Sequence, residues 1–392
     1  MSHPLINRST DLKALRDKGY GVEFRLGGYL VVHKIAYLNS KKEPAFGTLI
    51  VKLHLATDEQ LLEPNDHVAY FAGEMPCNVS GVPMEHLAAN HSEVEMAGIA
   101  VHHTLSRHPV GRQYKDYYEL VTTYDDLINL PAWQVAAVTS KSFPFIESVE
   151  EESVFHYTDT ASSRAEIDSI TRKLAIGKVA VVGGGGTGSY VVDLVAKTPV
   201  SEIHIFDGDR LFQHNAFRAP GAATKDELKA QILKVDYLYN RYSNMHRRIV
   251  KHDYFVTETN VDELREMQFV FLCFDETKAK RMVIDNLEAF GVPFIDVGMG
   301  INVVAGKLTG MLRTVLSTPA NRAVARENIP LEGGEVEDEY ATNIQIADLN
   351  ALNAALAVMK WKKTLGFYAD VAKESCSLFQ LSSNFIVNTD FL

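Results

Sequence analysis

The chain has few cysteines, a deficit of positive charge and no long hydrophobic run. Three of its 392 residues are cysteines, and no two form a Cys-x-x-Cys pair, which excludes a four-cysteine zinc site and a disulfide framework. The longest apolar runs have the length of a strand, so we expect neither a signal peptide nor a membrane span. The net charge of −11 argues against nucleic-acid binding. Sparse, unpaired cysteines are typical of a reducing compartment, so we predict a cytoplasmic protein.

What the chain does contain is a glycine-rich segment between a strand pattern and a helix pattern. Residues 178–182 form a β-branched run typical of a buried parallel strand, and residues 189–197 have helical spacing. Glycines let the turn bring backbone N–H groups close to a ligand, and the helix N-terminus favours phosphate. The segment therefore predicts a nucleotide site at four glycines: Gly183, Gly185, Gly186 and Gly188.

The residues after this segment narrow the choice of nucleotide. Asp207 ends a second strand about 20 residues after the glycines, the usual place of an acid that binds ribose hydroxyls. Arg218 follows, and residues 224–242 form a helical stretch that carries several lysines. A further buried strand, residues 267–274, ends at Asp275. Cations that offset phosphate charge, together with a second carboxylate at the same sheet edge, fit ATP with Mg²⁺.

These motifs resemble the ThiF/MoeB family, which is homologous to the adenylation domains of ubiquitin-activating enzymes. The resemblance rests on GGGGTGS from Gly183, DGD from Asp207, NAFR from Asn215 and CFDE from Cys273, and it covers roughly residues 160 to 375. It implies a Rossmann-like α/β domain with a mainly parallel sheet. Residues 327–341, which are rich in acids, would then be either a loop that arches over the substrate's C-terminal tail or an ordinary solvated connection.

The resemblance also implies a role for each matching residue. The four glycines line the nucleotide, Asp207 binds the ribose, and Asn215 and Arg218 contact the triphosphate. Lys229 is the best match to the family's phosphate-binding lysine, with Lys225 and Lys234 as alternatives because the spacing could shift. Asp275 binds Mg²⁺. Asp209 is either a second metal or nucleotide ligand or a turn residue at the strand end.

The implied reaction is ATP-dependent adenylation of the C-terminal carboxylate of a ubiquitin-like or sulfur-carrier protein. A bacterial ubiquitin-like conjugation or defence system is one setting in which this reaction would occur. Partners would be that carrier protein and a conjugating enzyme, and the family pattern implies a homodimer. In the family an arginine ahead of the first strand often reaches across the dimer, and Arg164 and Arg172 are candidates by position, although either could lie on a solvated helix face.

Transfer of the activated carboxylate to a cysteine would need a nucleophilic thiol. Cys376 is a candidate for a thioester and Cys273 is interpreted as a core residue. Cys77 lies in a turn-rich segment near several histidines, so it could be a conjugating-enzyme-like thioester site or a metal ligand. The alternative for Cys376 is a small buried apolar residue. The alternative for the Cys77 segment is a recognition domain that binds the substrate or a partner protein.

The first part of the chain differs in pattern and predicts a separate domain. Strand patterns in residues 20–38, 46–55 and 67–74 precede a helix pattern in residues 124–138, which indicates a smaller α+β domain. We therefore expect an N-terminal recognition domain over residues 1–146, an acidic and polar linker over 147–163, and the ATP-binding domain over 164–392.

Three other functions stay open at this point. The same site could adenylate a small-molecule or peptide carboxylate. An NAD-binding Rossmann oxidoreductase would share the glycines and Asp207, but it has no need of Arg218 or Asp275. A non-catalytic scaffold is the remaining alternative.

Overall fold

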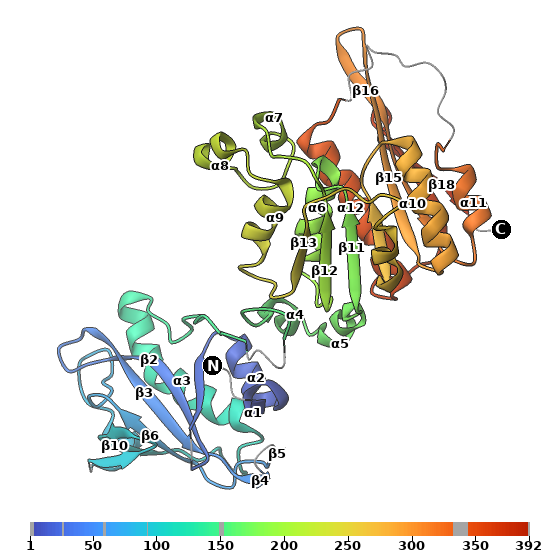
Figure 1. Cartoon of the computed structure of the whole chain (residues 1–392). Coiled ribbons are helices and arrows are strands. Elements are labelled where there is room, and N and C mark those ends of the chain that lie inside the picture. Colours follow the sequence, from blue (N-terminus) through green and yellow to red (C-terminus); the bar gives the residue numbers. More distant parts are fainter. Residues whose placement is uncertain are drawn as a thin grey trace. The chain divides into compact units, whose positions relative to one another are not determined.

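The structure is a computed structural model, and the chain folds into two compact units (Figure 1). It describes residues 4–25, 27–57, 60–91, 93–148, 153–331 and 344–390. One unit comprises Met1–Val149 with Tyr157–Glu166, and the other comprises Glu150–His156 with Ile167–Leu392. The expected linker, residues 147–163, is thus divided between them. Each unit is described by itself below.

The N-terminal unit is built on an antiparallel sheet of six strands in the order β1-β2-β3-β6-β10-β7. Strand β2 forms a hairpin with β1 and pairs on its other side with β3. The strands of the unit are β1 (Gly21–Arg25), β2 (Tyr29–Leu38), β3 (Pro44–Lys52), β4 (Leu55–Thr57), β5 (Gln60–Leu61), β6 (Val68–Ala72), β7 (Ala88–Asn90), β8 (Val94–Met96), β9 (Ile99–Val101) and β10 (His103–Ser106). Its helical segments are α1 (Pro4–Arg8), α2 (Thr10–Asp17), η1 (Glu85–Leu87), α3 (Tyr117–Ala136) and α4 (Thr160–Arg164).

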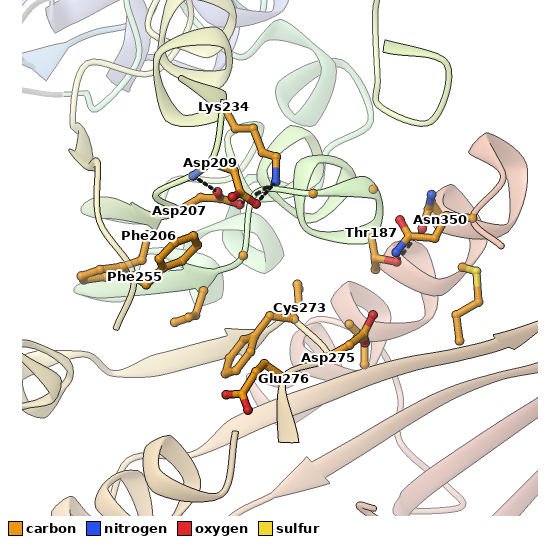
Figure 2. Close-up of a pocket in the computed structure, with 18 of the residues that line it drawn as sticks. Thr187, Phe206, Asp207, Asp209, Lys234, Phe255, Cys273, Asp275, Glu276 and Asn350 are labelled. Carbon is orange, nitrogen blue, oxygen red and sulfur yellow. Dashed lines mark hydrogen bonds and ion pairs between the residues drawn. The ribbon is translucent and has the colours of Figure 1, made fainter. Parts of the chain in front are cut away.

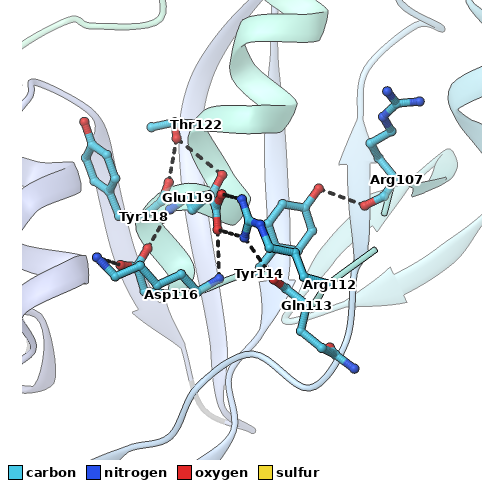
Figure 3. A network of polar contacts seen from close by, with 9 residues as sticks. Arg107, Arg112, Gln113, Tyr114, Asp116, Tyr118, Glu119 and Thr122 are labelled. Carbon is cyan, nitrogen blue, oxygen red and sulfur yellow. Dashed lines mark hydrogen bonds and ion pairs between the residues drawn. The ribbon is translucent and has the colours of Figure 1, made fainter. Parts of the chain in front are cut away.

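Helix α3 packs on the sheet and begins at a polar network (Figure 3). The side chain of Asp116 accepts a hydrogen bond from the Glu119 N–H at 2.8 Å, as an N-cap does. Glu119 in turn accepts from the Lys115 N–H and from the Arg112 guanidinium, both at 2.8 Å. The hydrogen bond from Arg112 lowers the pKa of Glu119 to about 2. Capping therefore sets where α3 starts, seven residues before the start that the sequence pattern suggested.

The C-terminal unit is a Rossmann-like α/β domain on a mixed sheet of eight strands, in the order β13-β12-β11-β14-β15-β16-β17-β18. The five strands from β13 to β15 pair in parallel, and the remaining pairings are antiparallel. Its strands are β11 (Lys178–Val182), β12 (Glu202–Phe206), β13 (Ile249–His252), β14 (Phe269–Leu272), β15 (Phe294–Val304), β16 (Lys307–Ser317), β17 (Glu374–Gln380) and β18 (Phe385–Asp390). The expected fold class, a Rossmann-like domain preceded by a smaller α+β domain, is confirmed.

Helices cover both faces of this sheet, so its parallel strands are buried and apolar (Figure 1). On one face, Val179 and Val181 pack with residues of α6, α9 and α12, including Trp361. On the other face, Ala180 and Val182 pack with residues of α10, α11 and η3. The helical segments are α5 (Asp168–Thr171), η2 (Arg172–Leu174), α6 (Gly186–Val195), α7 (Gln213–Ala216), α8 (Lys225–Ala230), α9 (Lys234–Tyr242), η3 (Val261–Glu266), α10 (Thr277–Phe290), α11 (Arg322–Glu327) and α12 (Ala347–Thr364).

The helical stretch expected over residues 224–242 is in fact two helices. Helix α8 ends at Gln231, which adopts a left-handed backbone conformation with φ of 48°. The backbone of Leu211 then hydrogen-bonds Ile232 at 2.7 Å, and the Lys234 N–H hydrogen-bonds the Asp209 carbonyl at 2.9 Å. Helix α9 starts at Lys234 and is thereby anchored to the segment after β12.

Among the helices of the described residues, none is long and apolar enough to span a membrane. The expected loop over the substrate tail falls largely on residues 332–343, which lie outside the described residues.

Candidate active site

A cavity of about 530 Å³ opens at the carboxyl ends of β11, β12 and β14 in the C-terminal unit (Figure 2). This edge is where ligands bind in open α/β sheets. The cavity is lined by the glycine segment, by the residues after β12 and β14, and by one face of α12. The polar and charged lining residues are Thr187, Asp207, Asp209, Arg218, Lys234, Thr257, Asp275, Glu276, Gln345, Asn350 and Asn353.

The glycine segment forms a close turn between β11 and α6. Gly183 has a φ of 95°, and a Cβ there would lie 2.6 Å from the Cys273 carbonyl oxygen. Gly185 precedes α6, lines the cavity, and has no atom within 4 Å of the position of a Cβ. That space is available to a ligand. Because α6 begins here, its unpaired N–H groups and positive dipole end lie at the cavity, as a phosphate site requires.

Asp207 is almost fully buried and organises the β12 side of the cavity. One of its carboxylate oxygens accepts the Gly184 N–H at 2.7 Å and the other accepts the Asp209 N–H at 2.8 Å. Lys234 Nζ lies 2.6 Å from an Asp209 oxygen and 3.5 Å from an Asp207 oxygen. The glycine turn, the end of β12 and the start of α9 are therefore joined at one carboxylate. Phe206 and Phe255 give the same side of the cavity an apolar wall (Figure 2).

Arg218 and Asp275 lie in the part of the cavity beside the glycine turn and β14. Burial lowers the pKa of Arg218, and the charge of Asp275 opposes that shift. Arg218 Nε is buried without a hydrogen-bond partner among the described residues. A buried guanidinium nitrogen without a partner is costly, so this group fits an anionic ligand that would supply the acceptor.

Three of the expected nucleotide-binding residues, Gly188, Asn215 and Lys229, do not line the cavity. Gly188 packs inside the fold, where a Cβ would lie 1.8 Å from the Gly183 carbonyl oxygen. Asn215 is buried and its side-chain oxygen accepts the Phe212 N–H at 2.8 Å. The Arg218 N–H donates to the Asn215 carbonyl at 3.1 Å. Asn215 therefore positions the turn that carries Arg218, while Gly183, Gly185, Gly186, Asp207, Asp209, Arg218 and Asp275 all line the cavity.

The lysine at the cavity is Lys234, and the structure corrects the preference for Lys229. Lys229 is exposed on α8, in a separate shallow hollow with Phe212 and His214. Lys225 lines that same hollow. The break at Gln231 is the reason, because it separates these two lysines from the helix that starts at the cavity.

The candidate thioester cysteines are buried in the structure. Cys376 is 1% exposed on β17 within the core. Cys77 is 0% exposed, and burial raises the pKa of its thiol, which donates to the Met75 carbonyl at 3.3 Å. Neither arrangement favours a nucleophile. Cys273 lines the cavity after β14, and burial raises its pKa as well.

Arg164 and the histidines near Cys77 belong to the N-terminal unit and do not line the cavity. In the N-terminal unit, the guanidinium of Arg164 stacks over the Phe143 ring at 4.7 Å. Near Cys77 in sequence, His91 and His103 approach each other at 2.9 Å between their Nδ1 atoms. Among the described residues, however, no group of three or more His, Cys, Asp or Glu side chains could hold a metal ion.

The residues of α12 that line the cavity, Asn350 and Asn353, were not among the predicted site residues. Asn350 accepts a hydrogen bond from the Thr187 hydroxyl at 2.9 Å and donates to the Arg218 carbonyl at 3.4 Å. Asn353, one turn further along, is fully buried and donates to the Gly298 carbonyl at 3.1 Å. The available signal was an Asn-x-x-Asn pair in a largely apolar helix, since residues three apart share a helix face.

Comparison with protein families identifies the class of the C-terminal unit. The model of the ThiF family matches residues 159–380, more than half of the chain, so the chain belongs to the ThiF family. This confirms the resemblance that the glycine, Asp207, Asn215 and Cys273 motifs indicated. Residues 10–160 match a second family, described as a domain of unknown function (DUF6791).

Solved structures with a similar fold include PaaA and Escherichia coli MccB. The PaaA crystal structure is 15% identical, with a TM-score of 0.44 over 57% of this chain and 76% of PaaA. A complex of MccB with MccA is 16% identical, with a TM-score of 0.46 over 57% of this chain and 66% of MccB. MccB with ATP is 16% identical, with a TM-score of 0.45 over 56% and 65% of the two chains. The family assignment rests on the family model alone. No curated protein matches the chain.

Proposed function

We propose that the C-terminal unit is an ATP-dependent adenylyltransferase that activates a carboxylate. The observation that carries the proposal is the charge arrangement of one cavity. Arg218, Lys234 and Asp275 line it together with the glycine turn, at the carboxyl ends of parallel strands. Membership in the ThiF family supports the same conclusion.

ATP fits the cavity from β12 to β14. The buried carboxylate of Asp207 and the apolar wall of Phe206 and Phe255 suit the nucleoside end. The glycine turn, the N-terminus of α6 and Arg218 Nε, which has no hydrogen-bond partner within the described ranges, suit the phosphates. Lys234, held by Asp209, supplies a second positive charge.

Asp275 is the residue that would hold Mg²⁺. This ion is commonly bound by one or two carboxylates together with substrate phosphates, so a full set of protein ligands is not required. When bound, the ion would offset phosphate charge. The exposed carboxylate of Asp275 at the end of β14, close enough to Arg218 to affect its pKa, fits that role.

In the proposed reaction a carboxylate oxygen of the substrate attacks the α-phosphorus of ATP. The bond from that phosphorus to the bridging oxygen breaks, and pyrophosphate leaves with the bonding electrons. The products are an acyl-adenylate and pyrophosphate, and no proton changes place. Arg218 and Lys234 stabilise the charge that develops on the phosphates, and the glycine turn orients them.

The favoured substrate is the C-terminal carboxylate of a ubiquitin-like or sulfur-carrier protein, with a peptide or small-molecule carboxylate as the alternative. The separate N-terminal unit, which would recognise the carrier or a conjugating enzyme, supports a protein substrate. A cytoplasmic homodimer remains part of this proposal. An NAD-dependent oxidoreductase is disfavoured, because hydride transfer needs neither Arg218 nor Asp275, and both residues line the cavity.

ATP–pyrophosphate exchange tests the proposal directly. The full chain is incubated with ATP, labelled pyrophosphate, Mg²⁺ and a panel of ubiquitin-like proteins and peptides ending in Gly-Gly. We expect label to enter ATP with at least one carboxylate and Asp275→Ala to abolish exchange while the thermal unfolding temperature is kept. Full exchange by Asp275→Ala would remove the metal role, and tighter binding of NAD than of ATP would contradict the proposed reaction.

A further inference from the structure

The end of the cavity at α12 and β15 contains a buried hydrogen-bond acceptor that the ATP site does not use. Asn353 is 0% exposed, yet its Oδ1 has no hydrogen-bond partner among the described residues. Its orientation is fixed, because Nδ2 donates to the Gly298 carbonyl at 3.1 Å and the oxygen must therefore point the other way. Both Asn353 and Gly298 line the cavity.

A buried acceptor without a partner is costly, and native structures rarely leave one unexplained. A second acceptor, Gln345 Oε1, is also buried without a partner among the described residues and lines the same cavity. Two such acceptors in the lining of one cavity indicate a ligand that brings hydrogen-bond donors. ATP phosphates carry none at neutral pH, so the donors must come from another part of the bound molecules.

The position of Asn353 in the cavity indicates which part of the bound molecules would supply the hydrogen-bond donor. The sheet order places β11 and β14 between β12 and β15, so Asp207 and Gly298 are separated by about 14 Å across three strand spacings. Figure 2 shows the Asp207 and Lys234 cluster on one side, Asn350 on the other, and Asp275 nearer to Asn350. If the nucleoside lies at Asp207 and the phosphates at the glycine turn, the acyl substrate occupies the end at Asn353.

We propose that Asn353 determines substrate specificity by accepting the amide N–H of the substrate's last peptide bond, close to the carboxylate that is activated. The substrate would then be a peptide or protein C-terminus rather than an acid that lacks an amide. This inference rests on the proposed adenylation, because it needs the acyl group at this end of the cavity.

The chemistry of the acceptor favours an amide donor over a charged amine. The side-chain oxygen is neutral and fully buried, and the amide nitrogen of the same side chain donates to the neutral carbonyl of Gly298. A buried ammonium group would need a charged partner. A neutral peptide N–H needs only one acceptor, which Asn353 provides.

Binding of acyl-adenylate mimics tests the inference without knowledge of the natural substrate. The probes are N-acetylglycyl sulfamoyl adenosine, which carries the amide N–H, and its acetoxyacetyl counterpart, in which an ester oxygen replaces that N–H. Binding to the full chain is measured by calorimetry. We expect the amide mimic to bind about ten-fold more tightly, because the ester leaves the buried Asn353 oxygen without a donor.

The variant Asn353→Leu should bind both mimics equally, whereas Asn353→Asp, which keeps an acceptor oxygen, should still prefer the amide. Equal binding of the two mimics to the wild type would overturn the inference, and so would a ten-fold preference that persists in Asn353→Leu. If a variant fails to fold, the difference in affinity between the amide and ester mimics on the wild type tests the inference by itself. Binding of adenosine 5′-sulfamate separates the two proposals: if it and ATP both fail to bind, the proposed adenylation fails, and if they bind without discrimination at the amide, only the role of Asn353 fails.

Discussion

The ammonium group of Lys234 lies 2.6 Å from a carboxylate oxygen of Asp209 and is itself largely buried. Both residues line the cavity, and Asp209 is more than half exposed there, with 55% of its side chain accessible. An anionic ligand can therefore share or take over Lys234 from Asp209. We therefore propose that Lys234, rather than a lysine of α8, supplies positive charge to the phosphate site.

The first prediction concerns this lysine. Lys234→Met should lower kcat/KM for ATP–pyrophosphate exchange by about 10²-fold or more, since one preorganised charged donor contributes this much to phosphate stabilisation. Lys229→Met, the matched control on α8, should change it by less than about two-fold. Steady-state exchange assays on both variants provide the measurement. A large loss with Lys229→Met and none with Lys234→Met would show that the phosphate lysine lies on α8 after all.

The second prediction separates two glycines of the same motif. Gly185→Ala adds a methyl group in the open space of the cavity, at a φ of −73° that lies outside the left-handed region. It should weaken ATP binding about ten-fold or more and leave the unfolding temperature nearly unchanged. Gly188→Ala would force its Cβ to within 1.8 Å of the Gly183 carbonyl, so it should destabilise the fold. Calorimetry and thermal unfolding of both variants test this, and an unfolding temperature lowered equally by both would contradict it.

The third prediction concerns a buried ion cluster beneath the cavity. Asp296 is fully buried between Lys280 and Arg313, each 2.7 Å away. Lys280→Met removes one of the two cations and should lower the free energy of unfolding by about 3 kcal/mol or more. Exposed Lys278→Met on the same helix should change it by less than about 0.5 kcal/mol. Urea unfolding followed by the fluorescence of buried Trp361 gives the measurement, and equal stability of the two variants would count against the account.

The fourth prediction is a pH dependence of stability in the C-terminal unit. His246 is fully buried, its Nε2 bonds to the Val200 carbonyl at 2.9 Å, and burial lowers its pKa. The unfolded chain therefore takes up a proton near pH 6.5 that the folded chain does not. The stability that neutral His246 contributes is present above that pH and is lost as the pH falls below it, by up to about 1.4 kcal/mol per pH unit.

His246→Gln should show a smaller loss of stability than the wild type between pH 7.5 and 5.5, because its side chain does not titrate. Exposed His214→Gln is the control and should retain the wild-type pH dependence. Urea unfolding at several pH values provides the comparison. A pH dependence that is the same in the wild type and in His246→Gln would exclude His246 as its origin.

The sequence pattern was sufficient for the parts of the fold that local chemistry determines. The β-branched run at residues 178–182 is β11 to the residue, and Asp207 and Asp275 lie at the cavity because both follow parallel strands. The choice among Lys225, Lys229 and Lys234 could not be made. It depends on a left-handed residue at Gln231 and on the contact of Lys234 with Asp209, which comes from another part of the chain.

The end of the cavity at α12, which we propose for the acyl group, was not predicted from the sequence either. Asn350 and Asn353 lie in α12, whose other residues are mostly apolar. Their role depends on Thr187, Arg218 and Gly298, which the fold brings together from three distant segments. Burial of Cys77 and Cys376 is also a tertiary property, which the spacing of three cysteines could not reveal.

The most direct test of the central claim is the affinity of the full chain for N-acetylglycyl sulfamoyl adenosine, a stable mimic of an acyl-adenylate, relative to ATP and NAD. An enzyme that forms an acyl-adenylate should bind the mimic at least about 10²-fold more tightly than ATP, and Arg218→Ala should weaken that binding. Calorimetry with all three ligands gives the answer. A mimic that binds no more tightly than ATP, or NAD that binds more tightly than ATP, would contradict the proposed adenylation.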